Sequence, residues 1–158
     1  MEVISSATET AENRSIAFDN FEQLVESIDN ANNIEPLNLW PPLLAQLDSA
    51  EPEMRRMACW CIGTAVQNNP KSQERVLMLD AVPKLVKLAT GDEVPGVRRK
   101  AAYALSSEIR NCQPALKSCV KNLPSELKPQ GHEDMSAEDM AAIDDLLGRI
   151  RALEKPVT

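Results

Sequence analysis

The sequence predicts an all-α solenoid, because two stretches of it match each other in helix-forming patterns. Residues 51–58 and 94–101 share a proline, an Arg-Arg pair and an alanine at equivalent positions, 43 residues apart. The same register continues in three further pairs: Trp60 with Tyr103, Ile62 with Leu105, and Asn68 with Asn111. A period near this length is typical of α-solenoids, whose units bury their apolar faces only against neighbouring units.

The composition agrees with a single domain that has little affinity for nucleic acid. The chain has 158 residues, of which 43% are hydrophobic but only 3% aromatic, which suits thin helical layers filled by aliphatic side chains. The net charge of −7 disfavours attraction to phosphate backbones and anionic membranes. We therefore expect a monomer that binds neither nucleic acid nor membrane.

The four cysteines lie inside helical patterns rather than in a disulfide framework. Cys59 and Cys61 are two residues apart, so their side chains would diverge on one helix. Packing in the core is therefore favoured over a metal site. The sequence shows no signal peptide and no apolar run of about 18 residues. These observations predict a cytoplasmic protein in a reducing compartment, without metal or cofactor.

The N-terminal elements are predicted from composition and spacing. Residues 1–14 are polar and are expected to form a flexible leader. Apolar residues at helical intervals then predict a helix over 16–29. This helix is expected to end in the turn 29–33, where asparagine side chains compete with the backbone for hydrogen bonds. A pair of prolines predicts the start of another helix over 42–47.

Residues 15–123 are predicted to hold the repeated helices. The expected helices are 51–56, 57–70, 71–79, 81–89, 98–112 and 115–123. The stretch 81–89 has a proline in its first turn and one apolar face, as does the second helix of an armadillo repeat. We therefore predict an armadillo-like α-solenoid of about two full repeats, preceded by a partial N-terminal unit.

The C-terminal part is predicted to close the stack. Residues 124–135 are expected to form a linker, and residues 136–158 an amphipathic helix with a short tail. The helix is expected to open at Ser136, with Asp139 completing an approximate capping box. Its apolar stripe needs a partner surface, so we predict a C-terminal capping helix over the open end of the repeats.

The sequence offers no pattern that supports catalysis. The single histidine, His132, lies in the predicted linker without a nucleophile pattern near it. Neither a Gly-rich phosphate loop nor a Cys-x-x-Cys pair occurs. The acidic residues around Asp144 fit a solvated helix face better than a carboxylate pair for acid–base work. We therefore predict that the protein is not an enzyme.

Four side chains are expected to form a ladder along the two long helices: Trp60, Thr64, Tyr103 and Ser107. In armadillo proteins such a ladder lines the concave groove, and residues 101–107 resemble the family pattern Ala-x-Trp-Ala-Leu-Ser-Asn. Thr64 and Ser107 stand where that pattern has asparagine. A hydroxyl cannot make the two-pronged amide contact to a peptide backbone, which argues against peptide carriage. The two aromatic residues fit either contact with a partner or bridging of adjacent repeats.

A closer resemblance runs from about Ser15 to Leu153. The chain is similar there to the armadillo nucleotide exchange factors of heat-shock protein 70, with the fungal branch nearest. The stretches that carry the resemblance are 17–33, 60–69, 97–111 and 138–144. The run Gly-Thr-Ala-Val-Gln-Asn-Asn at 63–69 is specific to that family.

This resemblance implies a co-chaperone without cofactors. Such a factor would hold the second lobe of the chaperone's ATPase domain with its concave side, displace the first lobe, and so release ADP and the client. The residues implied to contact the chaperone are Asn30, Ala31, Asn32, Asn33, Trp60, Thr64, Asn68, Asn69, Tyr103, Ser107, Arg110 and Asn111. The asparagine turns also fit a plain helix-ending role, and the two roles are compatible.

One departure from the family concerns the N-terminus. Members usually carry a Leu-Leu-x-Trp-Ser-like opening and a Leu-Phe-Gly-Gly-Pro motif, and residues 1–14 contain neither. We therefore expect an N-terminally shortened member whose first helix, 16–28, has an under-covered apolar face. Two alternative functions stay open, namely an armadillo-type interaction adaptor and a shortened copy that has lost exchange activity.

Overall fold

A computed structural model describes residues 1–153 and 155–157, and this part of the chain consists of helices joined by turns and loops. Glu154 and Thr158, which belong to the predicted C-terminal part, lie outside the described residues. The α-helices are α1 (Glu2–Ser5), α2 (Ala11–Val25), α3 (Ile28–Asn33), α4 (Trp40–Ala45), α5 (Pro52–Val66), α6 (Pro70–Met78), α7 (Ala81–Gly91), α8 (Pro95–Ile109), α9 (Gln113–Asn122) and α10 (Met140–Arg151). Three short 3₁₀ turns are η1 (Gln46–Asp48), η2 (Ser125–Leu127) and η3 (His132–Asp134). Among the described residues, no helix combines the length and apolar character needed to cross a membrane.

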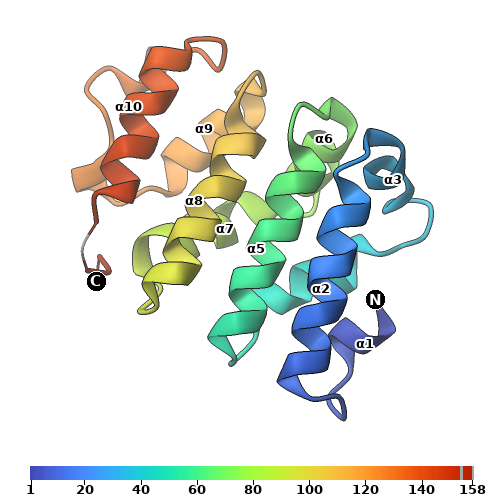
Figure 1. The fold of residues 1–158 in the computed structure, drawn as a ribbon. Coiled ribbons are helices and arrows are strands. Elements are labelled where there is room, and N and C mark those ends of the chain that lie inside the picture. The colour runs from blue at the N-terminus through green and yellow to red at the C-terminus, as the bar shows by residue number, and fades with distance from the viewer. Residues whose placement is uncertain (154, 158) are drawn as a thin grey trace.

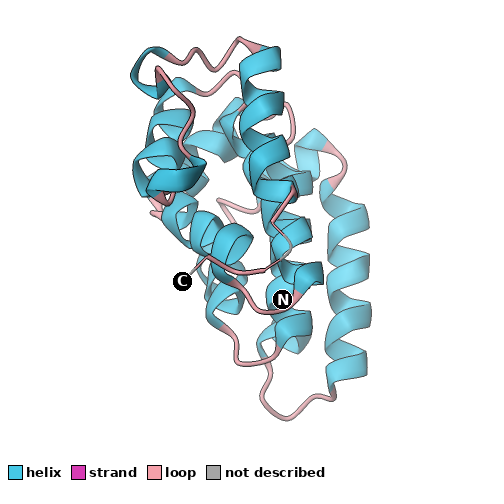
Figure 2. Ribbon diagram, turned by 90° about the vertical axis from the view of Figure 1, so that its left-hand side faces the viewer, coloured by secondary structure: helices cyan, strands magenta, loops and turns pink. Residues whose placement is uncertain are grey.

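The long helices α2, α5 and α8 lie side by side in one row, and each has 15 residues (Figure 1). Helix α10 continues the row next to α8, whereas α7 and α9 lie behind it. Seen from the α10 end, the described chain is a stack of helices connected by loops (Figure 2). Helix α10 thus lies where the sequence predicts a capping helix.

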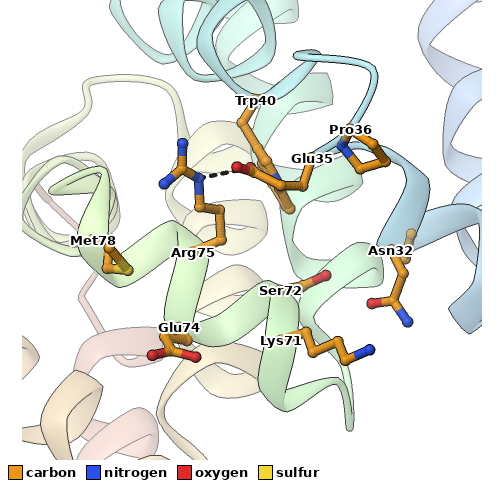
Figure 3. Close-up of a pocket in the computed structure, with 10 residues that line it drawn as sticks. Asn32, Glu35, Pro36, Trp40, Lys71, Ser72, Glu74, Arg75 and Met78 are labelled. Atoms are coloured by element: carbon orange, nitrogen blue, oxygen red, sulfur yellow. Dashed lines mark ion pairs between the residues drawn. The ribbon is translucent and has the colours of Figure 1, made fainter.

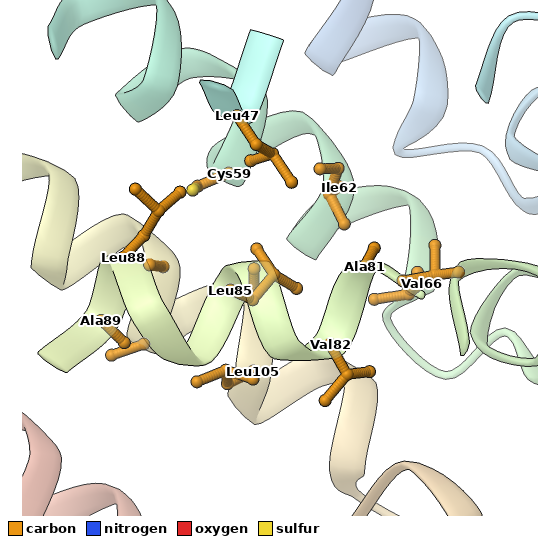
Figure 4. Packing of buried hydrophobic residues seen from close by; sticks show 14 of the residues in the cluster. Leu47, Cys59, Ile62, Val66, Ala81, Val82, Leu85, Leu88, Ala89 and Leu105 are labelled. Atoms are coloured by element: carbon orange, nitrogen blue, oxygen red, sulfur yellow. The ribbon is translucent and has the colours of Figure 1, made fainter. Parts of the chain in front are cut away.

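The hydrophobic core lies between the row and the helices behind it. Leu47 from η1 and Ile62 from α5 face Leu85 of α7, and Leu105 of α8 lies on the other side of α7 (Figure 4). All four side chains are buried. Because α7 contributes side chains toward both long helices, neither helix can bury its apolar face alone, as expected for a solenoid.

The predicted starts of both long helices inside the repeats are wrong, and both helices also end earlier than predicted, at Val66 and Ile109. The sequence predicts a short helix over 51–56 before the long one, but α5 runs without a break from Pro52 to Val66. Helix α8 likewise begins at Pro95 rather than at Arg98. In both cases proline occupies the first turn, where its missing N–H leaves no hydrogen bond unmade, so it starts the long helix.

The N-terminal residues differ from the predicted flexible leader 1–14. Helix α1 lies within this range, and its residue Ile4 is completely buried. Arg14 holds the segment, since its guanidinium donates to the Ile4 carbonyl at 3.0 Å and pairs with Glu51 at 2.7 Å. Helix α2 also begins inside this range, after the N-cap residue Thr10. One buried apolar side chain and one arginine thus anchor a stretch that is mostly polar.

The predicted turn 29–33 is also wrong, because this segment forms most of helix α3. The chain breaks earlier, after Val25, and Ser27 has an extended backbone before α3 starts. The Asn30 side chain donates to the Leu24 carbonyl at 2.8 Å across this break. The asparagine amide therefore stabilises the end of the preceding helix while its own segment is helical.

The predicted linker 124–135 contains η2 and η3 and leads to the last helix. Helix α10 begins at Met140, later than the predicted start at Ser136. The reason is the N-cap, because the Asp139 side chain accepts the Ala142 N–H at 3.1 Å. Asp139, which was predicted to complete a capping box opened by Ser136, is therefore itself the N-cap residue.

Apolar side chains are exposed at the N-terminal end of the row, as the sequence analysis predicts. Ile16, Leu24 and Ile28 are 54%, 59% and 53% exposed. We expect faster amide exchange in α2 than in α5, because local stability follows buried apolar contacts. Hydrogen exchange followed by mass spectrometry measures this difference, and equal protection of the two helices would contradict it.

Candidate functional site

The ladder links three long helices through polar contacts. The Thr64 hydroxyl on α5 donates to Glu22 Oε1 on α2 at 2.6 Å. The Tyr103 hydroxyl on α8 lies 3.3 Å from the same Thr64 oxygen. Ser107, the fourth ladder residue, is buried. Glu22 therefore belongs to this constellation, although the sequence analysis did not select it.

A lysine covers the aromatic side chains of the ladder. Lys100 Nζ lies 4.0 Å from the centroid of the Trp60 ring and 5.5 Å from that of Tyr103. Burial lowers the pKa of Lys100, and the nearby charge of Arg56 lowers it further. Both aromatic rings are half-buried, so this face combines aromatic surface with positive charge. Lys100 was missed because its partner Trp60 lies in another repeat.

Gly63 sets the approach of α5 to α8 at the ladder. A Cβ atom at this position would lie 2.5 Å from Cε1 of Tyr103 and 3.0 Å from Cα of Ala104. The Tyr103 ring therefore packs directly on the α5 backbone. Only glycine leaves room for this contact.

Replacing Gly63 by alanine is expected to lower the free energy of unfolding by about 1–2 kcal/mol, since overpacking outweighs the gain in helix propensity. Gly148→Ala in α10 is the matched control, because nothing lies within 4 Å of a Cβ at that position. The control is expected to be neutral or slightly stabilising. Urea denaturation measures both changes, and a stabilised Gly63→Ala variant would contradict the packing argument.

The asparagines at the helix ends have different environments. Asn68 and Asn111 are exposed, with left-handed backbone φ values of 51° and 56° that asparagine tolerates well. Asn69 is buried, and its side chain caps α6 by accepting the Ser72 N–H at 3.4 Å. Asn69 therefore has a structural role, and the structure does not present its side chain to a partner.

The predicted contact segment 30–33 is only partly accessible. Asn30 and Asn33 are exposed on α3. Ala31 is buried, so its side chain has no surface to offer. Two of the four predicted positions are thus exposed.

Asn32 lines a separate hollow of 270 Å³ between α3, α4 and α6 (Figure 3). Trp40 and Met78 contribute apolar surface, and an ion pair of Arg75 with Glu35 at 2.6 Å lies at this hollow. The ladder residues are not among its lining residues. The structure therefore does not bring Asn32 together with the ladder.

Arg110 connects the end of α8 to its neighbours. Its guanidinium pairs with Asp144 of α10 at 2.6 Å. Its carbonyl accepts a hydrogen bond from the Gln73 side chain of α6 at 2.9 Å. Arg110 is half-buried, so part of it remains available on the row.

The ladder borders a polar hollow of 380 Å³, which we call the ladder hollow. Its lining residues are Glu22, Glu26, Ile28, Thr64, Gln67, Asn68 and Tyr103. The structure thus joins three predicted site residues with two carboxylates that were not predicted. Glu22 and Glu26 are four residues apart in the chain, a spacing that places both on one helix face and could have identified them.

Solved structures with a similar fold confirm the armadillo-like solenoid. A designed armadillo repeat protein in complex with the peptide (KR)4 has a TM-score of 0.68 and 18% identity, covering 93% of this chain and 62% of that one. An engineered protein has a TM-score of 0.70 and 17% identity, covering 94% of this chain and 61% of that one. At such identities the likeness concerns the fold alone.

Family models match most of the chain. The model described as nucleotide exchange factor Fes1 matches residues 1–34, and that of the SIL1/FES1/HPBP1 C-terminal domain matches residues 30–122. Residues 1–14, which lack the two N-terminal motifs, fall inside the first match. The second match covers the ladder on both long helices.

Curated relatives agree with the family models. The Hsp70 nucleotide exchange factor FES1 of Coccidioides immitis is 53% identical over 153 residues, which are 97% of this chain and 72% of that protein. The protein of the same name from Gibberella zeae is 52% identical over 157 residues, covering 96% of this chain and 72% of its own. The chain therefore belongs to the Fes1 family of nucleotide exchange factors.

Proposed function

We propose that this chain is a nucleotide exchange factor of Hsp70 that binds the chaperone's ATPase domain and promotes release of ADP and client. The observation that carries the proposal is the 53% identity, over 97% of the chain, to a protein named Hsp70 nucleotide exchange factor FES1. The exposed face of the row, with the ladder at its centre, would supply the contact surface. Sites for covalent chemistry are not needed for this function, which only shifts a binding equilibrium.

The proposed mechanism is a shift between two states of the chaperone. The ladder face would hold the second lobe of the ATPase domain, and the bound solenoid would displace the first lobe so that ADP escapes. For this to occur, the factor must bind the open, nucleotide-free state more tightly than the ADP state. By linkage, bound ADP then lowers the affinity of the factor for the chaperone by the same ratio as the bound factor lowers the affinity for ADP.

The contact residues within this proposal are those that remain accessible on the row. They are Trp60, Asn68, Tyr103, Arg110 and Asn111, with Asn30 and Asn33 at the α3 edge. Thr64 and Ser107 would act mainly by holding the ladder in place. The protein would work as a monomer in the cytosol, which agrees with the buried free thiols of Cys59, Cys61 and Cys119.

The direct test is stopped-flow release of fluorescent ADP from the isolated ATPase domain, with and without an excess of this chain. Acceleration is the expected result. A chain that is folded by circular dichroism but gives no acceleration would contradict the proposal and favour a copy without exchange activity.

A peptide-binding adaptor has less support from the ladder geometry. The Thr64 hydroxyl, which stands where armadillo peptide carriers have asparagine, is already engaged by Glu22 at 2.6 Å. The single proton of this hydroxyl is therefore donated to Glu22 and is not available to a peptide carbonyl.

A further inference from the structure

The ladder hollow holds a carboxylate that has little compensation within the chain. Glu22 is only 6% exposed, and its carboxylate accepts one hydrogen bond in the described structure, from Thr64. Glu26 follows one turn later and is exposed at the rim. Within the described part of the chain, the lining of this hollow includes no basic residue. A carboxylate so far removed from water is stabilised by a nearby positive charge.

Two helix C-termini add to the negative potential of the ladder hollow. Glu26 is the C-cap of α2 and Gln67 is the C-cap of α5, and both residues line the hollow. The end of a helix carries a partial negative charge from its unpaired carbonyl groups. Neither helix has a basic residue in its last turn to offset this charge.

One cation close to this region, Lys100, contacts an aromatic ring and does not line the hollow. Lys100 stands over the Trp60 ring at 4.0 Å. The charge of Glu22 raises the pKa of Lys100, but burial lowers it by more. Lys100 therefore marks the positive, aromatic part of the row, and the ladder hollow marks the negative part.

We infer that the ladder hollow receives a basic side chain of the chaperone, which docks between Glu22 and Glu26 and against Tyr103. This inference rests on the proposed function, because it takes the ladder face as the contact surface. The open hollow of 380 Å³ can admit a lysine or arginine side chain. The two carboxylates and the helix ends attract the cation, and Tyr103 lines the hollow beside them. Such a contact steers association and fixes the orientation of the two proteins.

The test compares charge-neutral variants of the hollow with a matched variant outside it. Glu26→Gln removes one charge at an exposed position, and Glu22→Gln keeps an acceptor for the Thr64 hydroxyl. Glu126→Gln in η2 is the control, since it makes the same change at an exposed residue that does not line the hollow. Calorimetric titration with the nucleotide-free ATPase domain, at low and high salt, gives the affinities.

Both hollow variants are expected to bind at least about tenfold more weakly at low salt and to lose part of the salt dependence, whereas the control binds like the parent. Unchanged affinity and salt dependence in both variants, with an active parent, would overturn the inference and leave the proposed function standing. A folded parent chain that does not bind the ATPase domain at all would overturn the proposed function and this inference with it.

Discussion

Alanine at both Trp60 and Tyr103 is expected to reduce the acceleration of ADP release by at least about tenfold. The two half-buried rings present aromatic surface on the row, and aromatic side chains at the centre of an interface often contribute much of its binding energy. Stopped-flow release of fluorescent ADP measures the effect. The loss is expected at every concentration of the variant below saturation, because its affinity for the open state falls.

Controls separate this effect from damage to the fold. Met78→Ala removes a large exposed apolar side chain at the separate hollow that Asn32 and Trp40 line. This variant is expected to leave the acceleration of ADP release unchanged. Tyr103→Phe keeps the ring that packs on Gly63 but removes the hydroxyl near Thr64, so it should retain most activity. A folded Trp60→Ala/Tyr103→Ala variant with the parent's exchange rate would exclude the ladder as the contact surface.

The features that the sequence predicts well are those that repeat. Helices α5 and α8 lie side by side because the 43-residue register keeps equivalent side chains in equivalent places, which explains why the pairing of Trp60 with Tyr103 as ladder residues could be anticipated. The capping position of α10 follows from one apolar stripe that needs a partner. Patterns of this kind reflect packing that local spacing already encodes.

The features that were missed depend on contacts between distant segments. The contacts of Lys100 with Trp60 and of Glu22 with Thr64 join different helices, and the need for glycine at 63 is visible only once the Tyr103 ring lies on α5. Asn69 is a different case. The resemblance implied a contact role for the helix end 68–69, and the structure shows that the Asn69 side chain caps α6 and is buried.

Glu108 is expected to produce the largest pH effect on stability. It is a fully buried residue of α8, and neither of its carboxylate oxygens has a hydrogen-bond partner among the described residues. Burial raises the pKa of Glu108 from 4.5 to about 9. The folded chain therefore keeps this carboxyl protonated at neutral pH, whereas the unfolded chain releases the proton.

The sign of the pH dependence follows from these two values. Below pH 4.5 both states hold the proton, and the contribution of Glu108 to stability is fully present. As the pH rises toward 9, the unfolded state is increasingly favoured by proton release. Each pH unit in this window removes about 1.4 kcal/mol of the free energy of unfolding, which amounts to about 3 kcal/mol by pH 7.

Glu108→Gln is expected to remove this dependence, because an amide cannot ionise in either state. The free energy of unfolding of the variant, relative to the parent, should rise by about 3–4 kcal/mol between pH 5 and pH 8. Urea denaturation at several pH values measures the difference, and Glu126→Gln should show no comparable trend, since that residue is exposed. A difference between Glu108→Gln and the parent that stays constant with pH would mean that the carboxylate is ionised in the folded chain. In that case a cation would have to lie beside it, which contradicts the unpaired environment that the structure shows.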